Sequence, residues 1–146
     1  MKIREVEKGD LRAMLRLYMQ FHHTPMPEES EEIVGIWKDI LEAKNQHVLV
    51  GIVDGRIVTS CTLVIVPNLT HSQRPFAVIE NLITDEEFRR RGYGRKILDH
   101  AKELAIKDNC YKIMLITGAK DEGILNFYED LGYNRNDKRA FIKWLF

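Results

Sequence analysis

A short basic segment with two glycines separates an apolar run from an amphipathic run in the second half of the chain. It reads R-R-R-G-Y-G-R-K over residues 89–96, after the largely apolar residues 78–83 and before the amphipathic residues 97–106. A strand, a turn and a helix in this order leave the first N–H groups of the helix unpaired at the positive end of its dipole. Glycine lets a ligand approach the backbone closely, and five of the eight side chains are basic. The sequence therefore predicts an anion site for a phosphate or pyrophosphate group at this turn.

Two well-known phosphate-binding motifs do not match the turn. The phosphate loop G-x-x-x-x-G-K-[ST] is absent. The dinucleotide fingerprint requires a third glycine, but this chain has Ile97 there. It also requires an acidic residue after the following strand, and this chain has none at the expected place. A solvated basic patch or a nucleic-acid contact is the alternative interpretation of the basic run.

The composition is that of an ordinary globular chain. Of its 146 residues, 45% are hydrophobic and 30% are charged, which suits one domain over residues 1–146 with a real core. The formal net charge is zero, so no overall field would attract nucleic acid. Acidic residues gather instead at 28–32, and basic residues at 89–96 and 135–143. No apolar run approaches the roughly 20 residues that span a bilayer, so no membrane partner is expected.

Cysteine and histidine usage points to a reduced protein without a metal. The first residues, M-K-I-R-E, contain no apolar signal segment. Cys61 and Cys110 stand beside apolar runs without C-x-x-C spacing, which indicates two buried thiols and a cytoplasmic location. The five histidines have no Cys or Glu at ligand spacing, so no metal site is expected.

Hydrophobic periodicity predicts alternating strands and helices. Helices are expected from Asp10 to Met19, from Ser30 to Leu41, from Gly92 to about Asp108 and from Glu122 to Leu131. Strands are expected at residues 2–6, 47–53, 56–66, 76–84, 112–117 and 140–145. Loops are expected at residues 22–27 and 67–75, and Asp54-Gly55 reads as a hairpin turn. This order predicts an α/β fold with a mixed sheet and a right-handed β-α-β unit over residues 76–117.

Three segments in this order resemble the GNAT superfamily of N-acetyltransferases. The motif R-x-x-G-x-G at residues 89–94 resembles its acetyl-CoA signature, V-I-E-N-L at 78–82 its fourth strand, and N-F-Y-E-D-L-G-Y at 126–133 its late helix. Residues 110–115 are similar to the fifth strand of glucosamine-6-phosphate N-acetyltransferases. The resemblance covers nearly the whole chain. It implies a central, mostly antiparallel sheet of six to seven strands flanked by helices.

The resemblance also implies acetyl-CoA as co-substrate and a set of residues that bind it. Backbone groups of Leu82, Ile83 and Thr84 would face the pantetheine arm and the thioester carbonyl, at a strand bulge that the family carries. The turn would hold the phosphates through its main chain and some of its side chains; its members are Arg89, Arg90, Arg91, Gly92, Tyr93, Gly94, Arg95 and Lys96. Asp121 is a departure, because many members have an Asn there that reaches the pantetheine arm.

Two residues are candidates for proton transfer. Glu80 lies within an apolar strand, where burial would tune its proton affinity for a general base, directly or through a water molecule. The alternative is an outward-facing Glu paired with Arg or Lys. The resemblance makes Tyr128 the candidate acid for the leaving thiolate, since a phenol can donate to a thiolate. Its alternative role is that of a core tyrosine.

The expected activity is acetyl transfer from acetyl-CoA to the primary amine of a small molecule by direct attack. A protein or peptide N-acetyltransferase is the second reading, and the acidic residues 28–32 would suit a cationic acceptor. A nucleic-acid module and a non-catalytic acyl-CoA-binding module are the non-enzyme alternatives. His22 and His23 precede a Pro-containing loop at a possible acceptor rim, and Trp37 and Trp144 read as core or interface residues. The apolar residues 141–146, with the family's pairing through last strands, favour a homodimer.

Overall fold

The computed structural model describes all residues from 1 to 146 and is built on a five-stranded mixed sheet. Its strands lie in chain order: β1 (Lys2–Glu5), β2 (Gln46–Val53), β3 (Arg56–Val66), β4 (Phe76–Thr84) and β5 (Ile113–Leu115). The first four pair antiparallel, and β5 pairs parallel to β4. The expected α/β fold with a mixed, mostly antiparallel sheet is therefore confirmed.

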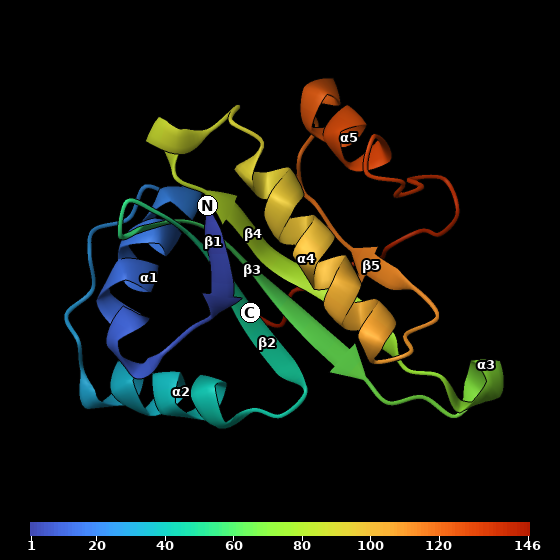
Figure 1. Ribbon diagram of the computed structural model, residues 1–146, viewed down its shortest axis with the longest axis horizontal. Helices are drawn as coiled ribbons and strands as arrows, with labels where there is room; N and C mark the ends of the chain where they lie inside the picture. The colour runs from blue at the N-terminus through green and yellow to red at the C-terminus, as the bar shows by residue number, and fades with distance from the viewer.

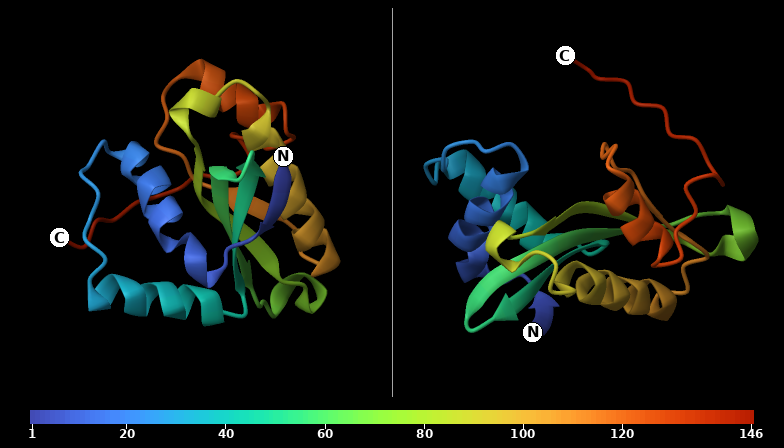
Figure 2. Two further views of the ribbon diagram at one scale, coloured as in Figure 1. Left: turned by 60° about the vertical axis from the view of Figure 1, so that its left-hand side comes forward. Right: turned by 90° about the horizontal axis from the view of Figure 1, so that it is seen from above.

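Helices cover both faces of this sheet. Helices α1 (Leu11–Tyr18) and α2 (Glu31–Glu42) lie on one face, and α4 (Tyr93–Lys107) lies on the other (Figures 1 and 2). Helix α5 (Glu122–Glu129) lies near the start of α4, and α3 (Thr70–Gln73) is a single turn in the connection between β3 and β4. The helix that links the parallel strands β4 and β5 is α4, as expected for a β-α-β unit.

Alternation along the strands divides the core into two clusters. Val48 and Val50 of β2 pack with Met14 of α1 and Trp37 of α2. Leu49, which lies between them, packs on the opposite face in the cluster that holds four residues of α4: Ile97, Leu98, Ala101 and Ala105. Because successive side chains of a strand point to opposite faces, each neighbour in register on β3 and β4 can be assigned to one of these two sides.

Local chemistry explains where the elements begin. Ser30 accepts a hydrogen bond from the Ile33 N–H at 3.3 Å and caps α2, and Asp121 caps α5 in the same way at 3.1 Å. Asp54 and Gly55 both have positive φ, at 48° and 77°, which is the geometry of a tight hairpin turn between β2 and β3. Asp121, where the family pattern has Asn, thus has a structural role at the start of α5.

The prediction of a last strand at residues 140–145 is wrong. These residues form no strand and extend away from the sheet (Figure 2), so the sheet has five strands rather than six or seven. Phe141 is 91% exposed and Trp144 73% exposed, so Trp144 is no core residue. An apolar pattern specifies a strand only when a neighbouring strand edge receives it, and here the chain leaves β5 without returning to it.

Three further expectations need adjustment. Strand β5 covers residues 113–115 and not 112–117, because its pairing with β4 ends there. Cys61 is buried, and burial raises the pKa of its thiol to about 12, whereas Cys110 is only half-buried. The 67–75 connection contains the α3 turn, in which His71 and Ser72 have left-handed backbone angles. None of the helices has both the length and the apolar character that a membrane crossing requires.

Candidate active site

Strand β4 carries a bulge in its second half. Thr62 of β3 pairs with Glu80, but Ser60, two residues on, pairs with Ile83, so Asn81 and Leu82 together oppose a single residue of β3. Asn81 has a positive φ of 51°, the left-handed conformation that one type of bulge has at its first residue. The bulge that the family resemblance implied is therefore present, and it re-aims the backbone directly after Glu80.

On its other side, β4 loses its partner strand at the same point. The pairing of β4 with β5 ends at Ile79 and Leu115, although β4 continues for five more residues to Thr84. The Ile83 carbonyl accepts a hydrogen bond from Thr59 Oγ1 at 2.9 Å, and the Thr84 carbonyl accepts one from Arg89 Nε at 3.2 Å. The backbone of residues 80–84 therefore has no strand neighbour on the β5 side.

The basic turn after β4 presents a row of free backbone donors. The N–H groups of Arg90, Arg91 and Gly92 donate to no group of the protein, and α4 makes its first i to i−4 bond only at Lys96, which donates to the Gly92 carbonyl at 3.1 Å. Gly92 caps α4 with a φ of 77°, a conformation that a side chain would strain. An anion placed at this row would meet several N–H donors and the positive end of the α4 dipole.

Gly94 lies where three elements meet. A Cβ atom added to it would stand 3.5 Å from Phe127 Cζ of α5 and 3.6 Å from Thr84 Oγ1 of β4. Gly94, which has no side chain, thus lies where the start of α4, the end of β4 and helix α5 come close together (Figure 1). The free N–H groups together with this bare backbone fit a phosphate group.

The basic side chains of the turn divide into two groups. Arg89 is tied to the Thr84 carbonyl and lies 3.6 Å from Glu86, and Arg91 donates to the Glu87 carbonyl at 3.0 Å. These two guanidinium groups stabilise the turn itself. The side chains with no ion pair and no hydrogen bond to the turn are exposed to solvent; they are Arg90, Arg95 and Lys96. The latter group is the one available to an anion.

An ion-paired anchor that the sequence analysis missed holds the turn in place. Asp85, which is only 4% exposed, accepts bonds from Arg56 Nη2 at 2.7 Å and from the Glu87 N–H at 3.1 Å. Arg56 also pairs with Glu87 at 2.8 Å, and Gln20 accepts from the Glu86 N–H at 3.0 Å. The sequence pattern that could have indicated this anchor is an Asp directly after a strand and before two Glu, since Asp is a frequent cap. Its partner Arg56 lies 29 residues away.

Glu80 is not buried as the sequence analysis assumed. The side chain is exposed and has no ion pair, so neither the buried acid nor the alternative paired Glu is observed. Its register partner Thr62 lies opposite Val48, which packs under α1 and α2, so Glu80 points to the α1 side of the sheet. The bulge begins at the next residue, and the pairing with β5 ends at the residue before it.

Tyr128 lies on the other side of the sheet. It packs on the cluster beneath α4. Its ring lies edge-on to the rings of Phe127 and Tyr133, with centroid separations of 5.2 Å and 6.2 Å. Burial raises the pKa of Tyr128, and burial, with the nearby Cys61 and Tyr128, raises that of Tyr133 to about 12. Both phenols therefore remain protonated donors near neutral pH.

The connection between α1 and α2 is acidic and open. Residues 28–32 and both His22 and His23 are exposed, whereas Trp37 is buried and donates from Nε1 to the Lys8 carbonyl at 3.1 Å. No group of three or more His, Cys, Asp and Glu side chains is arranged to hold a metal ion.

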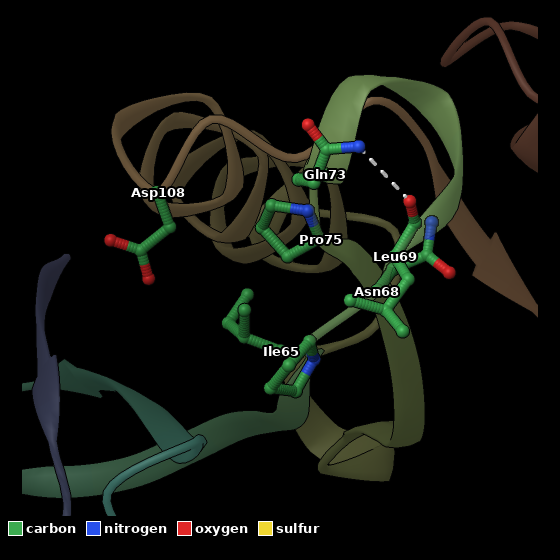
Figure 3. A pocket seen from close by; sticks show the side chains of 7 residues that line it. Ile65, Asn68, Leu69, Gln73, Pro75 and Asp108 are labelled. Atoms are coloured by element: carbon green, nitrogen blue, oxygen red, sulfur yellow. Dashed lines mark hydrogen bonds between the residues drawn. The ribbon is translucent and has the colours of Figure 1, made fainter.

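Two hollows lie on the surface, and only the second reaches a candidate residue. One, of about 520 Å³, is at the opposite end of α4, between Asp108 and the connection from β3 to β4 (Figure 3). Asn68 on its wall is already bonded to Thr70 and the Arg74 carbonyl, and Gln73 donates to the Leu69 carbonyl at 3.3 Å. The other, of about 790 Å³, is lined by β5, by α4 and α5 and by residues 131–140, and Tyr128 is on its wall. Neither contains Glu80 or the free donors of the turn.

Comparison with known proteins agrees with this arrangement. The family model described as the acetyltransferase (GNAT) family matches residues 11–133. Glucosamine 6-phosphate N-acetyltransferase of Trypanosoma brucei brucei is 28% identical over 144 residues, covering 95% of this chain and 92% of that protein. A protein from Agrobacterium tumefaciens str. C58 that is assigned as an acetyltransferase is 37% identical, covers 99% of this chain and is itself covered completely, with a TM-score of 0.91.

More distant structures share the fold alone. An aminoglycoside acetyltransferase from an uncultured soil metagenomic sample is 18% identical, with a TM-score of 0.82 over 99% of this chain and 95% of its own. The chain belongs to the acetyltransferase (GNAT) family, and it is an acetyl-CoA-dependent N-acetyltransferase.

Proposed function

We propose that the protein transfers an acetyl group from acetyl-CoA to the primary amine of a small molecule. The observation that carries this proposal is the free half of β4, residues 80–84, which lies between the anion-binding turn and the exposed Glu80. A small-molecule acceptor is supported by similar proteins, which are named for glucosamine 6-phosphate and for aminoglycosides.

The turn and β4 form the proposed cofactor site. The main-chain N–H groups of residues 90–95 hold the pyrophosphate, with Arg90, Arg95 and Lys96 adding charge, while Arg89 and Arg91 brace the turn. The backbone of Leu82, Ile83 and Thr84 lines the path towards the bulge and supplies N–H donors to the carbonyl oxygen as charge develops. Acetyl-CoA, when bound, supplies the thioester.

Two side chains carry the proposed proton transfers from opposite sides of β4. Glu80 takes a proton from the acceptor ammonium on the α1 side, directly or through a water molecule, which its exposure permits. Tyr128, held protonated on the α4 side by burial, donates a proton to the departing thiolate. This division leaves the attacking amine and the leaving group on different faces of the same strand.

The second candidate is a protein or peptide N-acetyltransferase, or any enzyme with a cationic acceptor. The exposed acidic residues 28–32 on the α1 side favour it. A panel of sugar amines, polyamines and lysine peptides with acetyl-CoA, followed by thiol release, decides between these acceptors. CoA binding without thiol release from any amine would contradict the enzymatic proposal and favour a binding module.

We expect Gly94→Val to weaken CoA binding by about tenfold or more without unfolding the protein, because a branched side chain would fill the space between the start of α4, the end of β4 and α5. Its Cβ would make only ordinary contacts with Phe127 and Thr84. Calorimetric titration with CoA measures the effect. Gly35→Val is the matched control, since Gly35 in α2 has no atoms within 4 Å of an added Cβ. Equal affinity of both variants and wild type would reject this placement of the phosphates.

We expect Glu80→Gln to lower turnover at neutral pH by about 10²-fold, the usual size of a general-base effect. CoA affinity should stay unchanged, because Glu80 lies on the α1 side of the sheet and the turn does not contact it. Glu103→Gln on the exposed surface of α4 is the control. If Glu80→Gln keeps the wild-type rate and pH profile, the carboxylate has no part in deprotonation.

We expect Tyr128→Phe to slow the chemical step by about tenfold or more, with little change in melting temperature, because the ring packing is retained. An ordinary phenol has a pKa of about 10, and burial raises the pKa of Tyr128 above that value. The wild-type rate should therefore fall only at a pH above this range, where the phenol loses its proton. The variant should lack this alkaline limb. Rate profiles from pH 7 to 11 measure both; a wild-type rate in the variant would leave Tyr128 a packing residue.

We also propose that the active form is a homodimer joined through the C-terminal segment. The outer edge of β5 is unpaired, and the exposed apolar residues 141–146 can add to that edge in a second copy. Sedimentation should show a dimer for the full chain and a monomer for a chain that ends at residue 139. A full-length monomer at micromolar concentration would contradict this assembly.

A further inference from the structure

Three hydroxyl side chains gather on the α1 side of the sheet, next to Glu80. Ser60 and Thr62 lie on β3 in register with Val50 and Val48, so they share the face on which α1 packs. Ser60 is 0% exposed and Thr62 7% exposed. Tyr18, at the end of α1, faces both of them. Helix α1 therefore covers a polar spot in an otherwise apolar strand.

The fold alone does not account for Ser60. Its Oγ is buried without a hydrogen-bond partner, a loss that costs about 1–3 kcal/mol for a buried hydroxyl. The neighbouring Thr59 points to the other side of the sheet and is hydrogen-bonded, as buried hydroxyl groups usually are. Its Oγ1 donates to the Ile83 carbonyl at 2.9 Å. The buried hydroxyl of Ser60 therefore needs a partner, and the phenol of Tyr18, which faces it, is the available group.

Tyr18 connects this spot to solvent. Its ring packs on the cluster formed by Met14, Trp37, Val48 and Val50, while the residue remains partly exposed. Burial raises the pKa of the phenol, so the hydroxyl is neutral and protonated near pH 7. A neutral phenol whose O–H donates inwards, to Ser60 Oγ, keeps its oxygen lone pairs free to accept a bond from the outer side.

Glu80 is the charged group nearest to this spot along the sheet. It is the register partner of Thr62, and side chains directly opposite in an antiparallel pair have Cβ atoms about 5 Å apart. The bulge begins at the next residue, so the hydroxyl groups, the carboxylate and the free backbone of β4 lie within one local region. A protonated primary amine, which carries three N–H donors, matches one carboxylate and one phenolic oxygen as acceptors.

We propose that Tyr18 binds the ammonium group of the acceptor beside Glu80, and that Ser60 is the positioning residue that orients the phenol. When the amine binds, Tyr18 donates its O–H to Ser60 Oγ, which has no partner in the free protein, and accepts an N–H of the ammonium. Thr62 is the register partner of Glu80 on the same face. Tyr18 transfers no proton in this arrangement. The inference rests on the proposed acetyl transfer to an amine, and it adds the residue that recognises the amine.

Ser60→Ala tests the proposal because it should affect the melting temperature and the KM for the amine differently. Removing an unpaired buried hydroxyl should leave the melting temperature unchanged or raise it by a few degrees. The KM for the amine should nevertheless rise about tenfold, with CoA affinity unchanged. Tyr18→Phe should raise the same KM at least as much. Tyr111→Phe, whose ring stacks on His71 at 3.9 Å in the distant β3–β4 region, is the matched control.

A binding measurement separates this inference from the proposed activity. Methylamine titrated into the wild-type CoA complex should shift the amide signals of Ser60 and Thr62 in NMR spectra, and Tyr18→Phe should weaken that binding about tenfold. No shift at these residues, or equal binding by Tyr18→Phe, overturns the inference whether or not any amine is acetylated. A lowered melting temperature in Ser60→Ala with unchanged KM also overturns it, since Ser60 would then be a structural hydroxyl. Binding with the expected loss, but without thiol release, would support the ammonium site and reject the acetyl transfer.

Discussion

The site depends on the interruption of pairing along β4. Backbone N–H and C=O groups in a sheet are normally bonded on both sides, and exposing them has a free-energy cost. Here the bulge at Asn81 and Leu82 disturbs the β3 side, and the early end of β5 at Leu115 frees the other. The result is a stretch of main chain in the middle of a rigid sheet that is open to a ligand, with neighbouring strands still fixing its position.

The proposed anion site relies more on backbone geometry than on the charge of its arginines. Two of them, Arg89 and Arg91, are used within the turn, and the donors left free are main-chain groups at the start of α4. The buried Asp85, bonded to Arg56, fixes the end of β4 from which the turn departs. A preorganised row of donors loses little conformational entropy when a ligand binds, which favours a backbone site over one made of flexible side chains.

The two faces of the sheet have different chemistry around β4. On the α4 side, Tyr128 lies among aromatic rings in a region where burial keeps phenols protonated. On the α1 side, an exposed carboxylate stands next to buried hydroxyl groups. Alternation along one strand separates these environments by a single layer of backbone. In the proposed reaction, the amine approaches the carbonyl from one side and the proton donor approaches from the other.

The sequence by itself determined most of the elements and the place of the turn, because apolar periodicity, caps and glycines act locally. It also indicated, through resemblance, the family and a bulge in β4. It was wrong about the last strand, since a strand needs an edge to pair with, and about the burial of Glu80, since burial depends on what lies across the sheet. The Asp85–Arg56 anchor and the grouping of Tyr18 with Ser60 join residues 29 and 42 positions apart in the chain. Only the tertiary structure decides such contacts, because their geometry arises from strand register and helix packing and leaves no periodic trace in the sequence.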